Sequence, residues 1–117
     1  MRLSRLICQT LEAKDCSVII LEPTRERILL KCTVRPNVRC TVVKSVRVCN
    51  AVERRIIKQS EAIRNGYLLA VPMIADDLVG MIVLKRGKNY RPFDRFDQEI
   101  LMTMGEQAVI GIRNLQL

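Results

Sequence analysis

Apolar and polar positions recur with two different periods along this chain, which predicts both helices and strands. Residues 3–13 and the region from Ile100 to Leu115 place apolar residues at three- and four-residue intervals. Both regions are therefore predicted to be amphipathic helices, the second about 20 residues long. A shorter apolar stripe follows Asn50, which has Glu53 three residues on, so a capped helix that ends near Gln59 is expected there.

The segments between these helices are typical of strands. Residues 16–21 and 28–33 are rich in β-branched side chains and are separated by a turn, which predicts a hairpin. A second hairpin is predicted from residues 67–74 and 78–85, after a break at Asn65-Gly66. Residues 35–48 suggest extended chain. The order of elements predicts a single α+β domain, residues 1–117, with an antiparallel sheet and helices on its faces.

Composition narrows the function classes. The chain has 117 residues, 49% of them hydrophobic, but only 3% are aromatic, so one aliphatic core is expected. No apolar stretch approaches the roughly 20 residues of a membrane span, and no signal peptide is recognisable, so we expect a cytoplasmic protein. Histidine is absent, which removes the usual haem ligand, the commonest zinc ligand and the commonest general base. An enzyme is therefore disfavoured.

The five cysteines form no Cys-X-X-Cys pair; they are Cys8, Cys16, Cys32, Cys40 and Cys49. Their number is odd, and their spacing matches neither a zinc site nor a redox pair. Reduced thiols that behave as small apolar residues are favoured over a metal or disulfide role.

The net charge of +8 comes entirely from the first half of the chain. Residues 1–64 hold 14 basic and 6 acidic residues, whereas residues 65–117 hold 6 of each. Between Arg27 and Arg47 all charged side chains are basic, and Arg27, Lys31, Arg35 and Arg39 would share one face of an extended strand. A solvated or partner-facing surface is favoured over nucleic-acid binding, because no aromatic residue lies in this stretch to stack on bases.

Five landmarks occur in order between Leu68 and Leu117: Val71-Pro72, Asp76-Asp77, Gly80, Phe93 with Asp97, and Asn114-Leu115. This half of the chain closely resembles the C-terminal half of GAF domains. The resemblance implies an antiparallel sheet of about five or six strands, with the N- and C-terminal helices on one face and a short helical connection on the other. The residues also have readings of their own. Pro72 suits a strand edge or bulge, Gly80 a close approach of another chain segment, and Asp94 or Asp97 the start of the last helix.

Three specialised GAF chemistries leave signatures that we compared with the chain. Of the cyclic-nucleotide pattern, which would fall on Lys85, Arg86, Phe93, Asp97 and Gln98, only Phe93 and Asp97 agree. Bilin and haem are disfavoured because there is no histidine. GAF-type thiol reductases use cysteines, but the motifs that surround their catalytic thiols are missing around Cys32, Cys40 and Cys49.

The resemblance thus implies a non-catalytic regulatory or sensory module that binds a small molecule or a protein partner and passes the signal through its terminal helices. Ligand binding is predicted between the sheet and residues 46–63, near Arg47, Cys49, Arg54 and Tyr67. A homodimer, or contact with a neighbouring signalling domain, would use the apolar positions of the terminal helices: Leu3, Leu6, Met104, Ala108, Ile112 and Leu115. The alternatives are a thiol-based GAF-type reductase and a basic adaptor that associates with itself, nucleic acid or another anionic partner.

Overall fold

The computed structural model describes residues 2–36, 40–48 and 50–115, and its strands form one antiparallel sheet. The strands are β1 (Asp15–Leu21), β2 (Arg27–Val34), β3 (Thr41–Arg47), β4 (Ile63–Asn65), β5 (Leu68–Ala75) and β6 (Asp77–Lys85). Their order across the described sheet is β3-β2-β1-β6-β5-β4. Both predicted hairpins are present, and the pairing of β1 with β6 joins them in the middle of the sheet.

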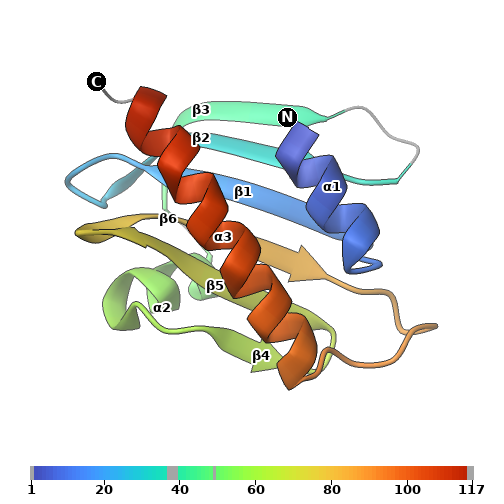
Figure 1. Ribbon diagram of the computed structural model, residues 1–117. Coiled ribbons are helices and arrows are strands. Elements are labelled where there is room, and N and C mark those ends of the chain that lie inside the picture. The colour runs from blue at the N-terminus through green and yellow to red at the C-terminus, as the bar shows by residue number, and fades with distance from the viewer. Residues whose placement is uncertain (1, 37–39, 49, 116–117) are drawn as a thin grey trace.

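Three helices cover this sheet (Figure 1). The terminal helices α1 (Arg2–Thr10) and α3 (Arg95–Leu115) lie on one face, and α2 (Ala51–Gln59) lies on the other. The α+β class and the placement of the helices are as predicted. None of the described helices is long and apolar enough to cross a membrane.

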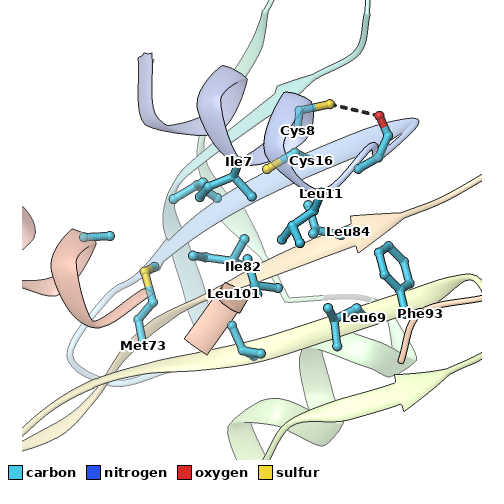
Figure 2. Packing of buried hydrophobic residues seen from close by; sticks show 14 of the residues in the cluster. Ile7, Cys8, Leu11, Cys16, Leu69, Met73, Ile82, Leu84, Phe93 and Leu101 are labelled. Atoms are coloured by element: carbon cyan, nitrogen blue, oxygen red, sulfur yellow. Dashed lines mark hydrogen bonds between the residues drawn. The ribbon is translucent and has the colours of Figure 1, made fainter. Parts of the chain in front are cut away.

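The main core lies between the sheet and the terminal helices, where Figure 2 shows side chains from five elements in contact. Ile7 of α1 and Leu11, the residue after this helix, pack on the sheet. Leu101 of α3 packs beside Ile82 of β6. The Cys8 thiol donates a hydrogen bond to the Ala13 carbonyl oxygen at 3.1 Å. This core is aliphatic except for Phe93, as the composition predicts.

A smaller core lies under α2. Ile56 is fully buried there and packs with apolar residues from several strands, including Ile19, Met81 and Ile63. Asn50 caps this helix, because its side-chain oxygen accepts a hydrogen bond from the Glu53 N–H at 2.8 Å. The helix ends at Ser60, which takes a left-handed conformation with φ of 51°. The predicted cap and end are both confirmed.

Two strand residues occupy the special positions expected of them. Gly80 lies where a Cβ atom would overlap the carbonyl oxygen of Ile19 on β1, so the close approach is real. Pro72 lies beyond the short strand β4, which pairs only with residues 68–70 of β5, so no neighbour on that side requires its missing N–H. A register shift follows at Met73 and Ile74.

Three features of the fold differ from what the sequence predicts. The first helix ends at Thr10 rather than residue 13, and β4 was not predicted because it is only three residues long. The register of β1 and β2 also shifts near Leu29, so that Ile28 and Lys31 both face α2 although they are three residues apart. This irregularity breaks the strict alternation that would place Arg27 and Lys31 on one face, and Arg39 lies outside the described residues.

Candidate functional site

An ion pair connects α2 to the sheet. The Lys31 ammonium on β2 donates to Oε2 of Glu53 on α2 at 2.9 Å. The Glu53 side chain is only 1% exposed, whereas that of Lys31 is 27% exposed. The second carboxylate oxygen of Glu53, Oε1, is buried and has no hydrogen-bond partner among the described residues. The pair therefore sets the position of the α2 N-terminus over β2 and leaves one buried acceptor unsatisfied.

Two adjoining hollows open beside this ion pair. One has a volume of about 210 Å³ and is lined by Asn50, Ala51 and Val52 of the α2 N-terminus, with the sheet below. The other, of about 140 Å³, continues toward Asp15, Thr33 and Arg35. They share four lining residues: Ser17, Lys31, Val83 and Lys85. We call the two hollows together the α2 groove.

Two of the three described cationic side chains in the α2 groove are paired with carboxylates. Arg35 donates to Asp15 at 2.8 Å, and Lys31 is occupied by Glu53. Within the described part of the chain, no carboxylate pairs with the ammonium of Lys85. Hydroxyl groups are also present, since Ser17 and Thr33 share a hydrogen bond at 3.0 Å. The groove thus offers a free cation and hydroxyls beside the positive end of a helix dipole, a combination suited to an anionic group.

The sequence profile of the GAF domain matches residues 2–114, nearly the whole chain. The chain is a GAF domain. No curated protein matches it in sequence. GAF domains are a family of sensory and regulatory domains that bind small molecules.

Solved GAF domains have the same fold at low sequence identity. The GAF domain of the Acinetobacter phosphoenolpyruvate-protein phosphotransferase is 15% identical with a TM-score of 0.79, over 97% of this chain and 80% of that one. The second GAF domain of DevS from Mycobacterium smegmatis is 17% identical with a TM-score of 0.70, over 98% and 94%. A GAF domain/HD domain protein from Geobacter sulfurreducens is 14% identical with a TM-score of 0.73, over 99% and 91%.

Of the four ligand residues predicted from the sequence of this GAF domain, the three that the structure describes do not line the α2 groove. Arg47 is exposed at the end of β3, and Arg54 is exposed on α2. Tyr67 is half-buried in the turn before β5, where its carbonyl oxygen accepts a hydrogen bond from the Arg86 N–H at 2.8 Å. Cys49 lies outside the described residues. A role for these four residues in ligand binding stays a prediction.

The residues that do line the groove were missed, although a signal for them is present in the sequence. Ser17 and Lys31 are polar residues flanked by apolar ones in their strands, Lys85 ends an apolar strand, and Glu53 is the acidic member of the predicted helix cap. Each fits an ordinary local role by itself. Only the strand register shows that the three polar strand residues belong to one region of the sheet, because Ser17 pairs with Val83, two residues from Lys85.

The predicted helix contacts divide into two groups. Ala108 is buried and Met104 is partly buried, and both pack on the core of their own domain. Leu6 is 55% exposed, together with Phe96, Met102 and Ile110 of α3. The side chains of Leu3, Ile112 and Leu115 lie outside the described ones. The terminal helices therefore keep an exposed apolar surface, made of residues that the predicted set only partly contains.

Three of the residues that fall on the cyclic-nucleotide pattern, Arg86, Phe93 and Asp97, form an internal network on the side of the sheet that α1 and α3 cover, whereas Lys85 lines the α2 groove. Arg86 is buried, its guanidinium stacks 4.1 Å from the centre of the Phe93 ring, and it donates to Asp97 at 3.3 Å and to the Leu11 carbonyl. Burial opposes the charge of Asp97, but hydrogen bonds from Arg91 and the Asp94 backbone, with the nearby charge of Arg86, lower its pKa to about 2. Asp94 and Asp97 also cap α3 reciprocally. This network joins α1, β6 and α3 and has a structural role.

The three buried thiols that the structure of this GAF domain describes are poorly placed for catalysis. Burial raises the pKa of Cys8, Cys16 and Cys32, which lowers the fraction of reactive thiolate. Among the described residues, no three side chains of the metal-binding types come together in a way that would hold a metal ion.

Proposed function

We propose that this GAF domain is a regulatory module whose α2 groove binds a small metabolite with an acidic group. The observation that supports the proposal most directly is that the N-terminus of α2 and the ammonium of Lys85 line the same hollow. A helix N-terminus favours negative charge through its dipole and its free N–H groups. An ammonium without a carboxylate partner adds a second attraction for the same charge.

The dimensions of the groove limit the ligand. Its larger hollow, of about 210 Å³, is smaller than the roughly 300–1,000 Å³ of pockets for drug-sized ligands. A carboxylic acid or phosphate ester with few heavy atoms suits this volume better than a nucleotide or a tetrapyrrole. Ile19, Val52 and Val83 supply apolar lining for the uncharged part of such a molecule, and the Ser17 hydroxyl supplies a further hydrogen bond.

Signal transfer would run through the sheet to the terminal helices. The strands β5 and β6 contact α2 on one face and α3 on the other. A ligand that moves α2 therefore acts on strands that α3 also contacts. The exposed apolar side chains Leu6, Phe96, Met102 and Ile110 provide a surface through which a second copy or a neighbouring domain would read that change.

Calorimetric titration of the purified domain with succinate and inorganic phosphate tests the ligand chemistry. We expect saturable binding of at least one of these acids, and we expect Lys85→Ala to weaken it by roughly tenfold or more, the usual effect of losing a charged hydrogen bond. Lys58→Ala is the matched control, because it removes one positive charge from an exposed position of α2 that does not line the groove. Equal weakening by both variants would show a general charge effect, and absence of binding would contradict the acidic-ligand proposal.

The thiol-reductase alternative has a separate test. Because none of the described cysteines lines the α2 groove, replacing all five cysteines by serine or alanine should leave acid binding largely intact. Turnover of an oxidised substrate by the unmodified domain, abolished in that variant, would favour the reductase instead.

A further inference from the structure

Two cysteines lie side by side at the edge of the sheet, outside the α2 groove. Cys32 belongs to β2, and Cys40 immediately precedes β3. The register pairs Cys32 with Val42, so Cys40, two residues before Val42, is the diagonal neighbour of Cys32 on the same face. That face is the one covered by α1, since Cys32 pairs on its other side with Val18 of the main core.

The surroundings of the two thiols differ. Cys32 is only 2% exposed, whereas Cys40 is partly exposed to solvent. Burial raises the pKa of Cys32, and the neighbouring Cys40 side chain raises it further. Cys40 precedes the first residue of β3, so the β-ladder does not hold its backbone as it holds Cys32. A small shift of this segment would bring the two sulfur atoms to bonding distance.

The remaining described thiols are less suited to oxidation. Cys8 is buried and its thiol donates to the Ala13 carbonyl oxygen, and Cys16 is fully buried beneath α1. Of the four described cysteines, Cys40 is the one that is not buried. Among these four thiols, an oxidant in solution therefore reaches Cys40 first, and Cys32 is its diagonal neighbour in the sheet.

We propose that Cys32 and Cys40 form a reversible disulfide when the domain meets hydrogen peroxide. The Cys40 thiolate attacks one peroxide oxygen, so that a sulfur–oxygen bond forms and the oxygen–oxygen bond breaks. The hydroxide that leaves takes up the proton that the Cys40 thiol released, which gives a sulfenic acid and water. The sulfur of Cys32 then attacks the sulfenic sulfur, so that the sulfur–sulfur bond forms and the sulfur–oxygen bond breaks, and the departing hydroxide takes up the proton of the Cys32 thiol to give a second water. Both thiols are oxidised, and the peroxide is reduced to two water molecules.

This bond would tie the edge strand to its neighbour. Within the described sheet β3 pairs with β2 alone, and α2 is the next element along the chain. Backbone hydrogen bonds hold β3 in the sheet along one side, so a covalent link near its first residue would restrict the motion of this edge strand. The site takes a peroxide as its reactant and does not depend on ligand binding in the α2 groove.

Tryptic mapping identifies the bond directly, because each cysteine of the chain falls on a different peptide. Trypsin cleaves after Lys31, Arg39 and Lys44 but not between Arg35 and Pro36, so Cys32 lies on peptide 32–39 and Cys40 on peptide 40–44. The full domain is treated with hydrogen peroxide under native conditions, alkylated and digested. We expect a linked pair of these two peptides, the loss of two thiols per chain by titration, and recovery of both with dithiothreitol.

Two variants separate the proposed bond from unspecific oxidation. Cys40→Ser should abolish the linked peptides, and it changes the one described cysteine that is not buried, so folding is preserved. Cys16→Ala is the control, because it removes a thiol from the core without adding a polar group, and it should leave the 32–39 to 40–44 link in place. No thiol loss, links that involve other cysteines, or oxidation of Cys40 to sulfinic acid without a link would each overturn the proposal.

Discussion

Replacing Lys31 by methionine should expose the cost of burying the Glu53 carboxylate. The substitution keeps most of the aliphatic stem of Lys31 and removes the ammonium that lies 2.9 Å from Glu53. Breaking a buried ion pair on one side generally costs about 3–5 kcal/mol, because the other charge stays buried. Since the Lys31 side chain is 27% exposed, water can reach this end of the pair. We therefore expect a loss of about 2–3 kcal/mol in the free energy of unfolding.

The double variant Lys31→Met with Glu53→Met distinguishes a charge effect from lost packing. Replacing both partners by apolar groups of similar volume is often nearly neutral, so the double variant should recover to within about 1 kcal/mol of the parent. Urea unfolding at neutral pH, followed by circular dichroism, measures all three free energies. Lys58→Met on the exposed part of α2 is the matched control, with an expected effect below about 0.5 kcal/mol.

Two results would refute this reasoning. A Lys31→Met variant as stable as the control would show that Glu53 is well solvated or otherwise satisfied without Lys31. A double variant as unstable as the single one would show that the Lys31 substitution acts through packing rather than through the stranded carboxylate.

Two further predictions concern stability. Asp97 has a pKa of about 2 in the folded domain and about 3.9 when unfolded, so it adds about 2.5 kcal/mol above about pH 5, which is lost as the pH falls toward 2. Asp97→Asn should flatten this part of a curve of urea midpoint against pH; an unchanged slope would contradict the assignment. Gly80→Ala should cost at least about 2 kcal/mol, because the new methyl group meets the Ile19 carbonyl. Gly111→Ala should instead raise the free energy of unfolding by up to about 1 kcal/mol, because no atom lies within 4 Å of the new methyl group and alanine favours the helix. The thermal unfolding midpoint should therefore fall in Gly80→Ala and rise in Gly111→Ala, and a change in the same direction in both variants would refute this prediction.

The elements with a strong local pattern could be predicted from the sequence. The spacing of apolar residues places α3, the Asn50 cap begins α2, and the turn at Ala75-Asp76 joins β5 to β6. The short strand β4 has only three residues and therefore no period to detect. The irregularity near Leu29 was equally hidden, because it depends on how β2 pairs with β1.

The ligand residues predicted from the sequence, Arg47, Cys49, Arg54 and Tyr67, stay a prediction. A hollow lies between the sheet and α2, and its lining comes from the first strand hairpin, β6 and the α2 cap. Linear distance conceals this, because Ser17, Lys31 and Lys85 are far apart in sequence.

The sequence by itself determines the α+β class, the two hairpins and the family, because apolar periodicity, turn residues and the landmarks after Leu68 are local properties of the chain. Which polar residues meet was decided only by the tertiary structure. The pairing of β1 with β6 brings Ser17 near Lys85, and the packing of α2 over β2 buries Glu53 against Lys31. The physical reason is that a lysine in a strand has the same local preferences whether or not a helix carboxylate lies above it, so burial and charge pairing appear only once the chain has folded.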